Sequence, residues 1–188
     1  IAKTLPTELN EELPRVTNPV DEDLQTDRLV IFNDGSSAVQ SGKLTEDNFS
    51  GFDMGANDLE IDFGRPGSPD LRTFKAGITY DEFEIVELLL GSNDDTLDIE
   101  STASGVLTVV HGGGGNDTIR LTPKSGETTA NAGGVNRMLA IFGDTTQDGQ
   151  RYNSRSDAID GSGRQFPAGG DDTINAAAAT GFVLAFGG

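Results

Sequence analysis

The chain has 188 residues, of which 31 are Asp or Glu, 13 are Lys or Arg and 25 are Gly, and its formal net charge is −18. A chain this acidic repels nucleic acid and anionic membrane surfaces and attracts divalent cations. The absence of Cys excludes disulfides and thiolate metal sites, and no apolar run is long enough to span a bilayer. We therefore expect no nucleic-acid partner and no membrane insertion.

Residues 1–26 are predicted to be an extended linker or arm. Three prolines, Pro6, Pro14 and Pro19, stand among acidic residues with little apolar periodicity. Such a segment buries too little surface to order itself, so a neighbouring element would have to hold it in place.

Residues 27–90 are predicted to be a β-rich first part or cap. Acidic and apolar residues alternate over residues 58–63, which predicts a strand with one buried and one solvated face. A loop, residues 64–70, follows. The other predicted strands in this part are residues 28–32, 78–80 and 84–90.

Residues 91–188 are predicted to be calcium-binding repeats that continue beyond the C-terminal end. Short strands are separated by turns rich in Gly and Asp, and helical periodicity is almost absent. Polar insertions occupy residues 123–136 and 145–156. The pattern favours an all-β chain, with strands at residues 97–100, 106–110, 118–121, 138–142 and 182–186.

The most informative stretch is residues 112–119, which read G-G-x-G-x-D-x-U, where U is a large apolar residue. Glycines allow a tight turn in which several carbonyl oxygens converge. Asp117 adds a hard anionic oxygen, which suits Ca²⁺, and Ile119 would point into an apolar core. The stretch indicates a metal-clamped structural element and identifies no reaction.

The same pattern recurs in the chain. Residues 91–97 repeat its second half with Asn93 at a glycine position, and Asn is well suited to replace Gly in a left-handed turn. Residues 169–174 form a third copy, and residues 157–159 a degenerate fourth. Recurrence of Asp followed by Thr and then Leu or Ile is difficult to obtain by chance.

Asp95 and Asp117 are 22 positions apart, about one coil of a parallel β-helix. Stacked coils would bring the two aspartates to one edge, where an ion could lie between successive turns. The predicted fold is therefore an all-β, parallel β-solenoid, similar to a β-helix or β-roll, with irregular insertions and an extended N-terminal arm.

The turns at residues 91–97, 112–119 and 169–174 resemble the hemolysin-type calcium-binding (RTX) repeats of secreted bacterial proteins. The longer pattern of residues 27–34, 77–84 and 89–97 is similar to modules of giant repetitive bacterial surface and extracellular proteins. The resemblance implies a parallel β-solenoid, bound calcium and export from a Gram-negative-type cell. The spacing of the copies is irregular and long insertions separate the later ones, which departs from the regular repeat pattern. We therefore expect calcium at one or a few turns and not at every turn.

The candidate calcium ligands are oxygen donors and turn glycines in or near these repeats. Asp95, Asp117 and Asp172 lead the set; the others are Asn93, Asp94, Gly113, Gly115, Asn116, Asp144, Asp157, Gly170 and Asp171. The alternative is that these aspartates only stabilise turns by Asx hydrogen bonds.

Other chemistry has weaker support. A phosphate-binding loop is set aside because the Lys-Ser/Thr pair and a following helix are missing. His111 is the only histidine and no Ser can be tied to it by sequence, so it is interpreted as a structural residue. Paired carboxylates such as Asp171 and Asp172 could serve acid chemistry, but their turn motif already explains them.

The first functional hypothesis is a calcium-stabilised, non-enzymatic structural module that stacks into an extracellular fibre, sheath or surface layer. Its partners would be calcium ions and neighbouring modules or copies of itself. The second hypothesis is an adhesin or carbohydrate-binding module that uses the loops at residues 64–70 and 145–156 to touch glycans or a cell surface. The third is a β-helical polysaccharide-processing enzyme or its accessory module.

Overall fold

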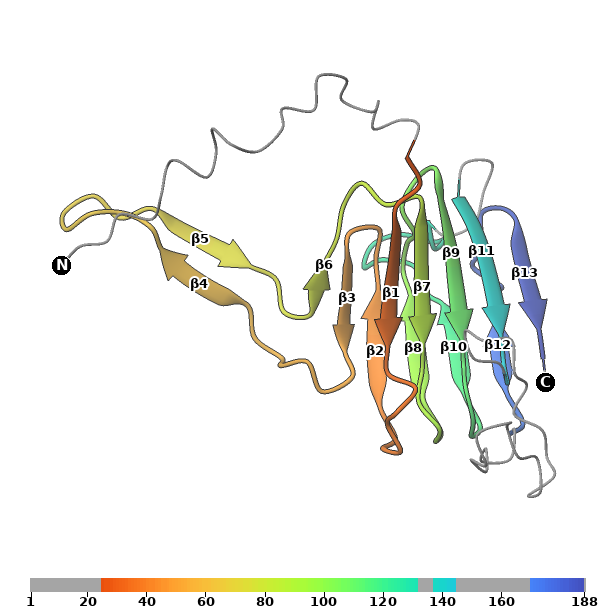
Figure 1. Ribbon diagram of the computed structural model, residues 1–188. Coiled ribbons are helices and arrows are strands. Elements are labelled where there is room, and N and C mark those ends of the chain that lie inside the picture. The colour runs from red at the N-terminus through yellow and green to blue at the C-terminus, as the bar shows by residue number, and fades with distance from the viewer. Residues whose placement is uncertain (1–24, 132–136, 145–169, 188) are drawn as a thin grey trace, which may run out of the picture.

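The computed structural model describes residues 25–131, 137–144 and 170–187, and this part of the chain consists of strands, turns and loops without a helix (Figure 1). Accordingly, no described segment could cross a membrane as a helix. The predicted arm at residues 1–26, apart from its last two residues, and the loop at 145–156 lie outside the described residues. The strands are β1 Arg28–Phe32, β2 Ser41–Leu44, β3 Asn48–Gly51, β4 Leu59–Asp62, β5 Leu71–Phe74, β6 Ile78–Thr79, β7 Ile85–Leu89, β8 Thr96–Ile99, β9 Val106–His111, β10 Thr118–Leu121, β11 Arg137–Phe142, β12 Thr173–Asn175 and β13 Val183–Phe186.

Five strands form a wholly parallel sheet in the order β1-β7-β9-β11-β13. Its strands are rich in Val, Ile and Leu, which suits sheets that are covered on at least one face. The pairing places Phe32, Leu89, His111, Phe142 and Phe186 in one row across the sheet.

A second sheet has six strands in the order β12-β10-β8-β2-β3-β6. The first four run parallel, whereas β3 is antiparallel to β2 and β6 is antiparallel to β3. From β7 onward the chain alternates between the two sheets, so each acidic turn connects a strand of one sheet to a strand of the other.

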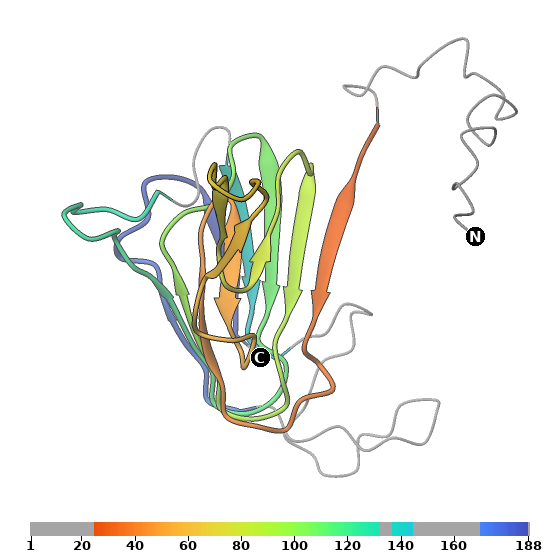
Figure 2. The ribbon, with the colours of Figure 1, turned by 90° about the vertical axis from the view of Figure 1, so that its left-hand side faces the viewer.

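The hydrophobic core lies between the two sheets, which face each other in Figure 2. Leu88, Val110 and Ile141 come from the five-stranded sheet, and Leu97 and Ile119 come from the six-stranded sheet; all five side chains are fully buried. Because side chains alternate along a strand, the neighbours of these residues point away from the core.

The predicted parallel β-solenoid is wrong. The strands are divided among three separate sheets, in which parallel and antiparallel pairing are mixed. The physical reason lies in residues 41–79, where a short turn folds β3 back on β2 and, after the β4–β5 hairpin, β6 pairs antiparallel with β3. Such local pairing needs no crossover connection, whereas parallel neighbours do.

The prediction for residues 58–63 is also partly wrong. They contain a strand, β4, but neither of its faces is buried. It pairs only with β5 in a two-stranded antiparallel hairpin, and every residue of both strands is exposed. Figure 1 shows this hairpin projecting from the side of the molecule opposite β13.

Candidate functional site

The acidic turns stack at the edge where strands of the five-stranded sheet end and the chain enters the other sheet (Figure 2). Thr96 pairs with Thr118, and Thr118 pairs with Thr173. The aspartates immediately before these threonines are therefore neighbours. The predicted juxtaposition of Asp95 and Asp117 is confirmed by this pairing.

The three aspartates form an inner ladder of side-chain to backbone hydrogen bonds. The amide of Asp95 donates to Oδ1 of Asp117 at 2.8 Å, and the amide of Asp117 donates to Oδ1 of Asp172 at 2.9 Å. Asp95 accepts bonds from the amides of Gln40 and Gly91, both at 2.8 Å. Both carboxylate oxygens of Asp95 are thus satisfied, which agrees with the role of a turn-stabilising residue.

The preceding residues form an outer ladder that is exposed to solvent. The amide of Asn116 donates to Oδ1 of Asp94, and the amide of Asp171 donates to Oδ1 of Asn116, both at 2.8 Å. Asn93 is also exposed, and its Oδ1 accepts the amide of Asp94 at 3.0 Å. These polar side chains stabilise the turns in a fully solvated setting.

Glycines allow the turns to stack closely. A Cβ on Gly113 would lie 2.1 Å from the carbonyl oxygen of Gly91, and a Cβ on Gly170 would lie 1.9 Å from that of Gly115. Gly113 and Gly115 also have φ of 94° and 104°, in the region that other residues rarely adopt. The glycines predicted as ligand positions are therefore required by backbone geometry.

A carboxyl cluster of Asp117, Asp144 and Asp172 lies at the inner side of the stacked turns. Among the described residues, the buried Oδ2 atoms of Asp117 and Asp172 accept no hydrogen bond. The carboxyl group of Asp144 lies within hydrogen-bonding reach of that of Asp172 and accepts the amide of Gly170 at 3.1 Å. The two carboxyl groups are therefore close neighbours, and the proximity of Asp144 contributes to the raised pKa of Asp172.

Burial dominates the electrostatics of the cluster. It raises the pKa of Asp117 to about 8, against the lowering effect of the amide of Asp95, and the charges of Asp172, Asp95 and Asp144 raise it further. Burial likewise raises the pKa of Asp95 and of Asp172. The folded chain therefore holds negative charge here at a cost that a bound cation would reduce.

The carboxylate oxygens of Asp117, Asp144 and Asp172 are hard ligand atoms of the kind that calcium prefers. Nevertheless, no group of three or more acidic or His side chains in the described part of the chain is arranged to hold a metal ion. Calcium takes about six to eight oxygen ligands, so an ion here would also need carbonyl oxygens of the turns and water. Calcium binding thus stays a prediction, with Asp117, Asp144 and Asp172 as its best-placed side chains.

The structure brings all candidate ligands to this edge except Asp157, which lies outside the described residues. Sequence reasoning missed Gln40, whose amide continues the inner ladder onto β2. It also missed the proximity of Asp144 and Asp172. Asp144 follows β11 in the sequence Gly143-Asp144, and Asp172 precedes β12 in the sequence Gly170-Asp171-Asp172. That shared Gly-Asp signal could have linked them.

His111 lies outside the carboxyl cluster. Its Nε2 is 2.9 Å from Oε1 of Glu87, which also pairs with Arg28, and its ring stacks on Phe142 at 5.3 Å. Burial lowers the pKa of His111, although Glu87 opposes this effect. The arrangement agrees with a structural role for this histidine.

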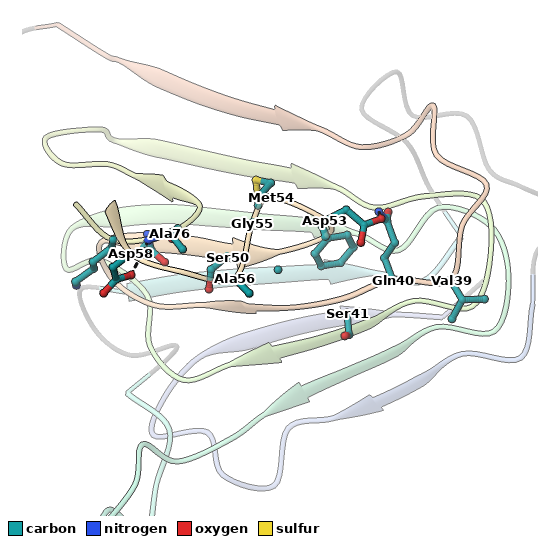
Figure 3. Close-up of a pocket in the computed structure, with 14 residues that line it drawn as sticks. Val39, Gln40, Ser41, Ser50, Asp53, Met54, Gly55, Ala56, Asp58 and Ala76 are labelled. Atoms are coloured by element: carbon teal, nitrogen blue, oxygen red, sulfur yellow. Dashed lines mark hydrogen bonds between the residues drawn. The ribbon is translucent and has the colours of Figure 1, made fainter. Parts of the chain in front are cut away.

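An open cavity of about 820 Å³ lies beside β2, β3 and the segment that leads to the hairpin (Figure 3). Its lining includes Phe52 and Asp53, which have φ of 49° and 61°. Consecutive non-glycine residues in this region are uncommon and indicate local strain. Gln40 donates to Oδ2 of Asp53 at 2.8 Å across the cavity wall.

Comparisons of the chain with family models, curated proteins and solved structures find no match. These comparisons therefore name no family for the chain.

Proposed function

We propose that this chain is a non-enzymatic structural module that calcium stabilises outside the cell and that associates with neighbouring copies of itself. The observation that carries the proposal is the pair of buried Oδ2 atoms on Asp117 and Asp172 that accept no hydrogen bond among the described residues. Asp144 adds a third carboxyl group in contact with Asp172. A divalent cation would neutralise this cluster and join turns that are distant in sequence.

Calcium binding would make the stability of the fold depend on whether the chain is inside or outside the cell. A ligand that binds only the folded state stabilises it by about 2.7 kcal/mol when its concentration is 100 times the dissociation constant. The chain would then be less stable at low cytosolic calcium and would gain stability at millimolar extracellular calcium. Because the chain has no Cys, calcium would take the place that disulfides have in other exported domains.

The test is urea unfolding of the 188-residue chain in chelator, in millimolar calcium and in millimolar magnesium, with calorimetric titration of calcium. We expect a higher unfolding midpoint in calcium, and loss of most of this gain in Asp172→Asn. Asp34→Asn is the matched control, because Asp34 is an exposed aspartate in a turn outside the cluster. A calcium-independent midpoint, or equal loss of the gain in both variants, would refute the proposal.

A second candidate function is carbohydrate binding in the cavity beside β2 and β3, and the strained pair Phe52 and Asp53 favours it. Strained residues cluster at ligand sites, and Asp53 offers a carboxylate to sugar hydroxyls. A glycan screen with the wild-type chain and Asp53→Ala tests it. Binding that Asp53→Ala abolishes would favour this function.

A further inference from the structure

The projecting hairpin of β4 and β5 exposes an unusual amount of apolar surface. Phe63 is 55% exposed and Phe74 is 47% exposed, and Leu59, Ile61 and Leu71 are exposed as well. An isolated two-stranded hairpin is marginally stable in water, and clustered exposed apolar side chains mark interaction sites. The hairpin therefore needs a partner to bury this surface.

One face of the hairpin carries most of the apolar side chains. Leu59 is opposite Phe74 and Ile61 is opposite Arg72, so these four share a face. Phe63 belongs to the same cluster, because its ring lies 6.3 Å from that of Phe74 and 5.2 Å from the guanidinium carbon of Arg72. The opposite face carries Glu60, Asp62, Leu71 and Thr73.

A second apolar surface, here called the end patch, lies on the outer side of β11 and β13. Leu139 and Val183 pack against the core, so Met138, Leu184 and Phe186 point to the opposite face. Met138 is 48% exposed and Phe186 is 46% exposed. The end patch consists of Met138, Phe182, Leu184 and Phe186.

The apolar hairpin face and the end patch contain eight of the eleven exposed large hydrophobic residues in the described part of the chain. The remaining three are Phe32, Val39 and Leu71. The hairpin and β13 lie on opposite sides of the molecule in Figure 1, so one copy cannot easily join its own two surfaces. A second copy can place its end patch against the hairpin of the first copy, and its hairpin against the end patch of a further copy.

The composition of the two surfaces agrees with this partner. Interface centres are enriched in aromatic residues, Met and Arg and depleted in carboxylates. The end patch has no charged member, and the hairpin face has Arg72, which is paired with Asp70 at 3.0 Å. Copies of a chain with net charge −18 repel one another, so contact is least unfavourable where carboxylates are few.

We propose that the apolar hairpin face of one copy packs on the end patch of the next copy. Two small sheets packed face to face bury both apolar surfaces and leave the acidic hairpin face in water. The contact is heterologous, so successive copies add in one direction and form an open chain. This inference rests on the self-association in the proposed function and names the surfaces that carry it.

The test uses analytical ultracentrifugation of the 188-residue chain over a wide concentration range, in calcium and in chelator. Phe63→Ser combined with Phe74→Ser removes the hairpin face, and Phe186→Ser alters the end patch. We expect each variant to weaken association at least about tenfold, as for central aromatic residues of interfaces. Leu71→Ser, on the acidic hairpin face, is the control and should associate like the wild type. Circular dichroism checks that each variant folds.

Mixing the variants decides between head-to-tail contact and contact between like surfaces. The hairpin variant retains its end patch and the end-patch variant retains its hairpin, so the mixture should form dimers that neither variant forms alone. Failure of the mixture to form dimers, or wild-type association by both variants, would overturn the proposal.

Cross-linking gives a second readout. Because the chain has no Cys, Ile61→Cys and Leu184→Cys place one thiol on each surface. A mixture of these variants should form the mixed disulfide in preference to either homodimer, and random pairing counts against the contact. Calcium titration separates the two proposals. A calcium-stabilised monomer overturns this contact and the self-association but leaves calcium stabilisation standing, whereas assembly through these surfaces with a calcium-independent unfolding midpoint overturns the calcium function alone.

Discussion

Stability of the calcium-free chain should fall as pH rises from about 4 to 8, which is opposite to the behaviour of a domain held by ion-paired carboxylates. The cause is Asp117, whose pKa is raised by burial from 3.8 to about 8. Between these values the folded state binds more protons than the unfolded state. Unfolding is therefore favoured as protons become scarce.

The size of the effect follows from the two pKa values. A tenfold change in proton affinity corresponds to about 1.4 kcal/mol, so the interval from 3.8 to about 8 corresponds to a loss on the order of 5 kcal/mol. Asp95 and Asp172, whose pKa values are also raised, act in the same direction, whereas His111, whose pKa is lowered by burial, opposes them in part. Typical domains have about 5–15 kcal/mol of stability, so the loss is easily measurable.

The assay is urea unfolding at several pH values between 4.5 and 8.5, in chelator and in calcium, for the wild type and Asp117→Asn. The amide cannot ionise but keeps an oxygen that can accept the amide of Asp95. In chelator at pH 8 the variant should be more stable than the wild type. In calcium the order should reverse, because the wild type alone keeps the charged ligand.

Two results would refute this reasoning. The first is a calcium-free wild type whose stability stays level or rises from pH 4.5 to 8. The second is an Asp117→Asn variant with the same pH dependence as the wild type, which would show that Asp117 is not the titrating group.

Other substitutions test the packing. Gly113→Ala should cost at least about 2 kcal/mol in urea unfolding, because its Cβ would lie 2.1 Å from the backbone carbonyl oxygen of Gly91 and its φ is 94°, whereas Gly35→Ala, with open space around it, should stay within about 0.5 kcal/mol. Leu97→Ala should cost about 2–5 kcal/mol because Leu97 is fully buried, and exposed Leu71→Ala should be nearly neutral; equal losses would contradict the assigned core. Glu87→Ala should cost about 1–3 kcal/mol by removing a hydrogen-bond partner of buried His111 and the ion-pair partner of Arg28, and a neutral result in thermal unfolding would count against that pairing.

The sequence by itself determined the local structure of the acidic turns. Glycines that permit φ > 0, followed by Asp and a β-branched residue, specify a turn that enters a strand, and this information is contained within eight residues. The interval between Asp95 and Asp117 also predicted their contact, because two repeats of similar length place equivalent residues side by side.

Only the tertiary structure decided which strands pair and which faces are buried. Residues 58–63 alternate as a half-buried strand would, but periodicity cannot show whether another layer covers the apolar face, and here none of the described residues does. Likewise, no local signal in the sequence showed that β2 pairs in parallel with β8 on one side and antiparallel with β3 on the other. Asp144 joins Asp172 because distant turns stack, and the resulting burial of charge is a property of the assembled sheets.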